Sequence, residues 1–138
     1  MKIAIDFDGT IVEDAYPEIG RPMMFAFETM KELQKQGHQL VLWTYRRGQP
    51  LRDAVAFCEE HGINFYAVNE SYPGESMEGI SRKIDAEIFI DDRNIGGFLG
   101  WSKVWELLNA DQPEMHFVDF EAHQNYKQEK SFWRKIFG

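Results

Sequence analysis

The stretch Lys2-Ile3-Ala4-Ile5-Asp6-Phe7-Asp8-Gly9-Thr10 lies near the amino terminus and decides the fold. It begins as a short apolar run and ends in two carboxylates and a glycine. A short apolar run closed by turn residues is typical of a strand buried on both faces of a sheet. Gly9 permits a sharp turn after the strand, because it has no Cβ. We therefore predict a buried strand whose carboxyl end carries Asp6 and Asp8.

The rest of the chain alternates apolar strands with amphipathic helices. The predicted strands are Lys2–Phe7, Gln39–Thr44, Phe65–Asn69 and Glu87–Asp92. The predicted helices are Met23–Gln36, ended by Gly37; a segment with the apolar stripe Leu51, Ala54, Val55 and Cys58, ended near Gly62; and a segment marked by Trp101, Val104, Trp105 and Leu108. This alternation predicts an α/β fold with a parallel sheet covered on both faces.

Length and composition exclude several classes of protein. A chain of 138 residues has the length of one domain, and its formal charge of −8 argues against a nucleic-acid partner. The start of the chain reaches Asp6 too early for a signal peptide, and no apolar run approaches the ~18 residues that a transmembrane segment needs. Cys58 is the single cysteine, so no intramolecular disulfide can form. We expect a cytoplasmic protein in which Cys58 is an inert core thiol.

Polar residues gather where the predicted strands end. These residues are Asp6, Asp8, Thr44, Asn69, Asp91 and Asp92. In parallel sheets the ligand binds beyond the carboxyl ends of the strands. Four carboxylates in one place would raise one another's pKa values unless a cation offsets them. Mg²⁺, a hard ion that prefers oxygen ligands, is the simplest such cation, and Lys83 is the natural second positive charge.

Four segments together resemble the motifs of the haloacid dehalogenase (HAD) superfamily of phosphohydrolases. They are Asp6-Phe7-Asp8-Gly9-Thr10, Val41-Leu42-Trp43-Thr44, Lys83, and Ile88-Phe89-Ile90-Asp91-Asp92. The resemblance covers roughly residues 1–109 and implies a Rossmann-like, three-layer α/β/α domain with a mainly parallel central sheet. We expect a single domain over 1–138, with its core in 1–109 and a helical C-terminal extension in 110–138.

The resemblance also implies a role for each motif residue. Asp6 would be the nucleophile that becomes an aspartyl phosphate, and Asp8 the general acid and base. Thr44 would hold a phosphoryl oxygen of the substrate, and Lys83 would neutralise the charge that gathers on Asp6.

The metal site implied by the resemblance shares some of these residues. Mg²⁺ would be held by Asp6, the Asp8 backbone carbonyl and Asp91, while Asp92 would be a ligand through water or would hold Lys83. Which of Asp91 and Asp92 is the direct ligand stays open.

Short connections indicate that the resemblance is to capless members of the superfamily. From Thr10 to the helix near Met23 there are about a dozen residues, enough for a small flap. Between Thr44 and Lys83 the pattern allows one helix, one strand and a loop. An open site suits either a small-molecule phosphate or a large phosphorylated substrate. A neighbouring subunit could serve as the lid, which makes a homo-oligomer plausible.

Three arginines are expected at the mouth of the site. Arg46 and Arg47 follow Thr44, and Arg93 follows the acidic pair. Arginines suit a second anionic group on the substrate, such as a phosphate or a carboxylate. The alternative is that an arginine pairs with an acidic residue on a neighbouring loop.

Residues 121–138 are basic and amphipathic, and we expect a terminal helix there. This helix would pack on its own domain; the alternative is that it docks a partner subunit or an anionic membrane surface.

The function expected from all these features is a Mg²⁺-dependent phosphatase, a phosphoric monoester hydrolase. A phosphotransferase or a non-catalytic, metal-binding regulatory protein would carry the same residues. A receiver-like signalling domain is disfavoured, because it places its acidic pair at the first strand.

Overall fold

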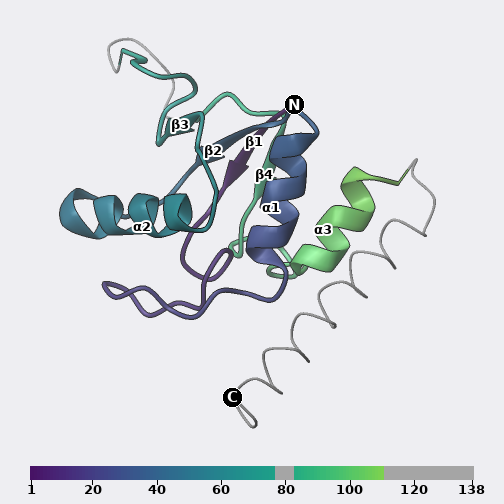
Figure 1. Cartoon of the computed structure of the whole chain (residues 1–138), viewed down its shortest axis with the longest axis horizontal. Helices are drawn as coiled ribbons and strands as arrows, with labels where there is room; N and C mark the ends of the chain where they lie inside the picture. Colours follow the sequence, from purple (N-terminus) through teal and green to yellow (C-terminus); the bar gives the residue numbers. More distant parts are fainter. Residues whose placement is uncertain (77–82, 111–138) are drawn as a thin grey trace, which may run out of the picture. The chain divides into compact units, whose positions relative to one another are not determined.

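The computed structural model describes residues 1–76 and 83–110. Along this part of the chain the elements are β1 (Lys2–Ile5), α1 (Ala26–Lys35), β2 (Gln39–Leu42), α2 (Gly48–Glu60), β3 (Ala67–Val68), β4 (Ile88–Ile90) and α3 (Trp101–Leu108) (Figure 1). The predicted order of strands and helices is confirmed. The strands are shorter than predicted, because their polar ends turn out of the sheet.

The chain divides into two compact units, Met1–Trp101 and Ser102–Gly138. The boundary between the units falls inside α3, and the single domain over 1–138 with its core in 1–109 stays a prediction. The sheet, α1 and α2 all belong to the first unit. The helix expected in 121–138 lies outside the described residues.

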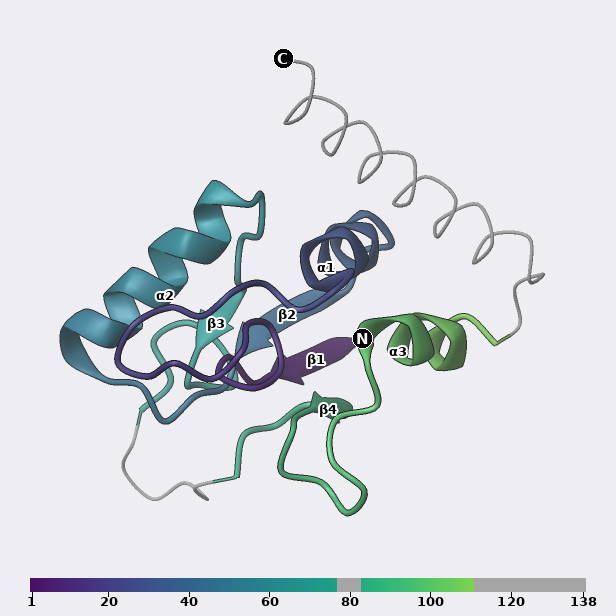
Figure 2. The same ribbon diagram turned by 90° about the horizontal axis from the view of Figure 1, so that it is seen from below.

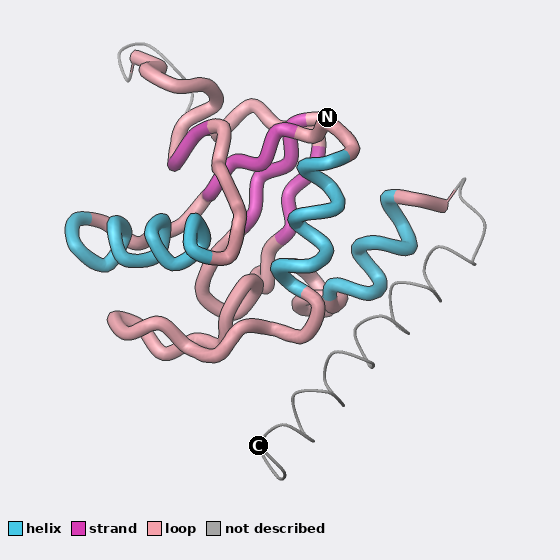
Figure 3. The backbone as a smooth tube through the Cα atoms, viewed as in Figure 1, coloured by secondary structure: helices cyan, strands magenta, loops and turns pink. Residues whose placement is uncertain are grey.

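The sheet has the strand order β3-β2-β1-β4, and all neighbouring strands are parallel. Ile5, the last residue of β1, pairs with Leu42 of β2 on one side and with Ile90 of β4 on the other. The carboxyl ends of these three strands therefore meet at one edge of the sheet. The predicted α/β, Rossmann-like class is confirmed, and Figure 3 shows loops at that edge.

Alternate side chains of each strand point to opposite faces of the sheet. Figure 2 shows α1 and α2 on the same face. Ala4, Val41 and Ala67 pack with Ile84, which comes from the connection between β3 and β4, and Trp43, Ala86 and Phe89 border this cluster. Ile3, Ile5, Leu40 and Leu42 alternate with them and are buried, so the sheet has apolar side chains on both faces.

Both predicted helix ends are confirmed at glycines. Gly37 has a φ of 89°, and the N–H of His38 donates to the carbonyl of Leu33 at 3.1 Å. Gly62 has a φ of 84°, and Ile63 donates in the same way to Cys58 at 3.0 Å. Left-handed glycines of this kind satisfy the last carbonyls of a helix. The start of α1 differs from the prediction: Phe25 takes a φ of 65°, so the helix begins at Ala26 and not at Met23.

Cys58 is fully buried on α2, and burial, followed by the charge of Glu59, raises the pKa of its thiol to about 12. It is a protonated core side chain at neutral pH, as predicted. Among the described residues, no helix has both the length and the apolar character to cross a membrane.

Candidate functional site

The site is built at the carboxyl end of β1, which pairs with β2 on one side and with β4 on the other. The N–H of Asp6 donates to the carbonyl of Ile90 at 2.9 Å, and the N–H of Trp43 donates to the carbonyl of Ile5 at 2.8 Å. The ladder thus holds the backbone of Asp6 in place before the chain turns away. Its side chain is presented at the edge of the sheet.

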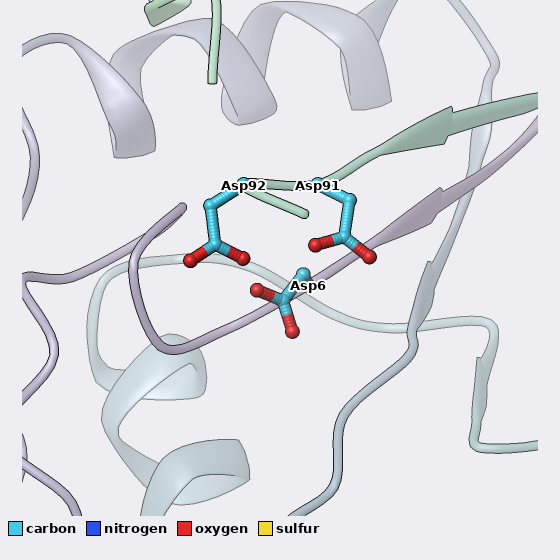
Figure 4. A group of neighbouring side chains, drawn as sticks. All are labelled: Asp6, Asp91 and Asp92. Carbon is cyan, nitrogen blue, oxygen red and sulfur yellow. The ribbon is translucent and has the colours of Figure 1, made fainter. Parts of the chain in front are cut away.

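Asp6, Asp91 and Asp92 form an acidic cluster. One carboxylate oxygen from each lies within 4.8 Å of the others, and all three residues are half-buried. Figure 4 shows the three carboxyl groups converging, Asp6 from the end of β1 and the other two from the end of β4. The N–H of Arg93 donates to Asp91 Oδ1 at 3.0 Å and helps to orient that carboxylate. The group could hold a metal ion.

The sequence predicts four crowded carboxylates that raise one another's pKa values. The structure brings three of them together, because Asp8 is paired with Arg46 instead. Burial, a hydrogen bond with Asp92 and the charges of Asp91 and Asp92 together raise the pKa of Asp6 to about 8. A bound cation would oppose this shift, because it favours the charged form of each carboxylate. Half-buried carboxylate oxygens are the donors that hard divalent ions prefer.

The turn after β1 is shaped around the acidic cluster. Gly9 has a φ of 83°, and a Cβ built at this position would lie 2.2 Å from Asp92 Oδ2. The hydroxyl of Thr10 donates to Asp6 Oδ2 at 3.2 Å, and the indole N–H of Trp101 donates to the carbonyl of Thr10 at 2.8 Å. The turn therefore needs glycine for two reasons, and a buried threonine holds the candidate nucleophile.

Asp8 lies apart from this group and is bound by Arg46. Arg46 Nε donates to Asp8 Oδ2 at 2.8 Å, and Nη2 donates to Asp8 Oδ1 at 2.7 Å. The Arg46 side chain is 1% exposed, and that of Asp8 is 19% exposed.

This burial corrects the expectation that Arg46 lies at an open mouth and binds substrate. Its guanidinium is committed to a carboxylate and to backbone carbonyls, because the loop after β2 turns it inward. The alternative prediction, that an arginine pairs with an acidic residue on a neighbouring loop, is correct for Arg46.

Thr44 follows β2 at the same edge of the sheet. Its N–H donates to Oδ1 of Asn69 at 2.8 Å, and its hydroxyl accepts from the N–H of Arg46 at 3.1 Å. Asn69 follows β3 with a φ of 55°, a conformation that asparagine tolerates better than most residues. The accepting hydroxyl still has its own hydrogen to donate to a ligand.

The other predicted cations are exposed. Lys83 Nζ lies 5.9 Å from the centroid of the Phe89 ring. Arg47 is the residue before α2, and the Arg93 guanidinium carbon lies 5.0 Å from the centroid of the Tyr45 ring. Tyr45 follows β2 and Arg93 follows β4, so this pair joins the two strands that flank β1.

Comparison with known proteins places the chain in a family. No model of a protein family matches it, and no curated protein matches it. A solved structure of a conserved protein from Bacteroides thetaiotaomicron is similar to it, with 48% sequence identity and a TM-score of 0.76 over 82% of this chain and 93% of that one. The chain belongs to the same family as that protein. The likeness establishes the fold, and the activity has to be argued from the site.

Sequence reasoning missed three features of the site. Thr10 belongs to the first motif, but the motif predicts no role for it. The sequence marks Asn69 only as a polar strand end, and its positive φ has no sequence signal beyond the asparagine itself. The pairing of Arg46 with Asp8 joins loops that are far apart in the sequence, and no local sequence pattern predicts it.

Proposed function

We propose that the protein is a Mg²⁺-dependent phosphatase that hydrolyses a phosphomonoester through an aspartyl phosphate on Asp6. The observation that carries this proposal is the convergence of Asp6 with Asp91 and Asp92 at the carboxyl end of the sheet. The order of the resembling motifs supports the same function.

Asp6, Asp91 and Asp92 would hold the ion, since their clustered oxygens fit a hard divalent cation. When bound, Mg²⁺ offsets the negative charge of the carboxylates and of the phosphoryl group.

The first step transfers the phosphoryl group to the protein. A carboxylate oxygen of Asp6 attacks phosphorus, and the bond from phosphorus to the leaving oxygen breaks. Asp8 donates a proton to that oxygen, so the leaving group departs as an alcohol. Thr44 and Lys83 would bind the oxygens of the transferred group, because phosphoryl transfer depends mainly on positioning and charge neutralisation.

The second step releases phosphate. Water attacks phosphorus and gives a proton to Asp8, and the bond between phosphorus and Asp6 breaks. Both carboxyl groups return to their starting state, and inorganic phosphate leaves.

Arg47 and Arg93 remain the candidate contacts for a second anionic group of the substrate. Both side chains are exposed near strand ends at the edge that carries Asp6. Arg46 takes no part in this contact.

The test is hydrolysis of p-nitrophenyl phosphate with and without Mg²⁺, by the wild type and by Asp6→Asn. We expect turnover that requires Mg²⁺ and is lost in Asp6→Asn by at least a factor of about 10³, because a missing nucleophile has no substitute. A panel of natural phosphate esters then identifies the substrate. Mg²⁺ binding without turnover on any of these esters would instead support the non-catalytic regulatory protein.

A further inference from the structure

Arg46 is a buried arginine with every donor engaged. A guanidinium has five N–H donors. Nε and one donor of Nη2 bind Asp8; Nη1 donates to the carbonyls of Pro17 at 3.0 Å and Pro50 at 3.2 Å; and Nη2 also donates to the carbonyl of Glu18 at 2.7 Å. Such a side chain binds parts of the protein to one another and has no donor left for a substrate.

The pairing with Asp8 fixes the orientation of that carboxyl group. Two parallel hydrogen bonds to a planar fork allow only one plane for the carboxylate. Each oxygen keeps a further lone pair, which can hold the proton that Asp8 gives to the leaving group, and the Asp8 side chain stays 19% exposed. Asp8 can therefore be held by Arg46 and still face a ligand.

The carbonyls of Pro17 and Glu18 belong to the flap, which we define as Glu13–Arg21. Its two limbs are joined where the N–H of Glu13 donates to the carbonyl of Arg21 at 2.8 Å. A Cβ on Gly20 would lie 1.9 Å from the carbonyl oxygen of Glu13, so the limbs also pack closely. Figures 1 and 2 show this loop extending from the end of β1 toward α2.

One aromatic ring from the turn after β1 and one from the flap lie near the Arg46 guanidinium. The Arg46 guanidinium carbon lies 4.9 Å from the centroid of Phe7, beside Asp8, and 5.2 Å from the centroid of Tyr16, at the tip of the flap. Pro50 adds the first turn of α2. One side chain thus joins the turn after β1, the tip of the flap and the start of α2.

We propose that Arg46 is a positioning residue that sets the orientation of Asp8 and holds the flap to it. The catalytic part of this inference rests on the proposed phosphatase activity, in which Asp8 transfers the proton. The flap is then a fixed wall of the site, and its position and that of Asp8 depend on each other.

The experiment compares Arg46→Gln and Arg46→Lys with the wild type, and uses Arg52→Gln as the matched control. Arg52 is an exposed arginine on α2 whose guanidinium donates to Gln49. The kinetic measurement is kcat/KM with Mg²⁺ for p-nitrophenyl phosphate and for glycerol 2-phosphate. The aryl leaving group departs without much help from an acid, whereas the alkyl group needs a proton.

We expect Arg46→Gln to lower kcat/KM for the alkyl ester about 10-fold more than for the aryl ester, because a misoriented acid costs most where protonation matters. Arg46→Lys keeps the charge without the fork and should lie between the wild type and Arg46→Gln. In an Asp8→Asn background, Arg46→Gln should leave unchanged the ratio of kcat/KM for the alkyl ester to kcat/KM for the aryl ester. An equal loss on both esters would mean that Arg46 is only structural, and would overturn the positioning role.

Hydrogen exchange of the flap amides provides a readout that needs no activity, and it can be made on Arg46→Lys if Arg46→Gln fails to fold. We expect faster exchange at Glu13 in the Arg46 variants and wild-type exchange in Arg52→Gln. Unchanged exchange would overturn the coupling of Arg46 to the flap. A wild type that hydrolyses neither ester, nor any ester of the natural panel, would refute the proposed phosphatase. Faster exchange in the flap of the Arg46 variants would still support the coupling of Arg46 to the flap.

Discussion

Three features of the structure meet at Asp6. Its backbone is held by the sheet, one of its oxygens accepts a hydrogen bond from Thr10, and two further carboxylates lie beside it. The same closeness makes its charge costly in the metal-free protein. Burial and the neighbouring acids raise its pKa to about 8, so folding favours the protonated form.

This shift predicts a pH dependence of stability without metal. Asp6 has an ordinary pKa of 3.8 and a folded pKa of about 8. Between these pH values the native state binds more protons than the unfolded state. The stability that the protonated Asp6 contributes is therefore complete below about pH 4 and is lost as the pH rises through about 8. Asp6→Asn cannot ionise. In EDTA at pH 8.5 we expect it to be more stable than the wild type by on the order of 1 kcal/mol.

Urea denaturation across pH 5–9 checks this expectation. Asp53→Asn, which changes an exposed aspartate on α2, is the control and should keep the wild-type slope. An Asp6→Asn protein with the wild-type slope of stability against pH would show that Asp6 ionises normally.

At the scale of the elements, the turns decide where each chemical group is presented. Gly37 and Gly9 both have a positive φ, but they differ in their surroundings. A Cβ at Gly37 would meet nothing within 4 Å, whereas a Cβ at Gly9 would lie 2.2 Å from Asp92 Oδ2. The turn that ends α1 needs glycine only for its backbone conformation. The turn after β1 also needs it for the close approach to the acidic cluster.

The two glycines therefore form a matched pair of substitutions. Gly37→Ala should lower stability by about 1 kcal/mol through backbone strain alone. Gly9→Ala should lower it by about 2 kcal/mol or more, because Asp92 must also move, and should weaken Mg²⁺ binding. Thermal unfolding and calorimetric titration with Mg²⁺ measure the two effects. Equal losses of stability and equal Mg²⁺ affinities would contradict the close packing of Gly9 against Asp92.

At the scale of the whole molecule, an ion bound by the acidic cluster would couple ligand binding to unfolding. The cluster unites the ends of β1 and β4, which lie far apart in the sequence. An ion that binds only the folded arrangement stabilises the protein by mass action.

Mg²⁺ at a hundredfold excess over its Kd should raise the unfolding free energy by about 2.7 kcal/mol. Differential scanning calorimetry measures the shift in Tm, with NaCl at matched ionic strength as the control for screening. Asp91→Asn should abolish most of the shift. A Tm that responds equally to NaCl and MgCl₂ would argue against a specific divalent site.

The sequence predicted much of this architecture because its signals are local. The apolar run ending at Asp6 and the run before Asp91 indicate buried strands, and parallel strands bring their carboxyl ends to one edge. Gly37 and Gly62 mark helix ends because a left-handed residue satisfies the last carbonyls. These rules place Asp6 and the acidic pair at the same edge of the sheet, and the pairing of β1 with β4 makes them neighbours.

Only the tertiary structure decided which side chains are partners. The sequence placed Arg46 beside Arg47 as an equal candidate for the substrate, yet one is buried and the other is exposed. The difference arises because the flap, the turn after β1 and the start of α2 converge on one guanidinium. Hydrogen-bond partners that lie some thirty residues apart depend on how loops meet in space, and the periodicity of strands and helices carries no information about that meeting.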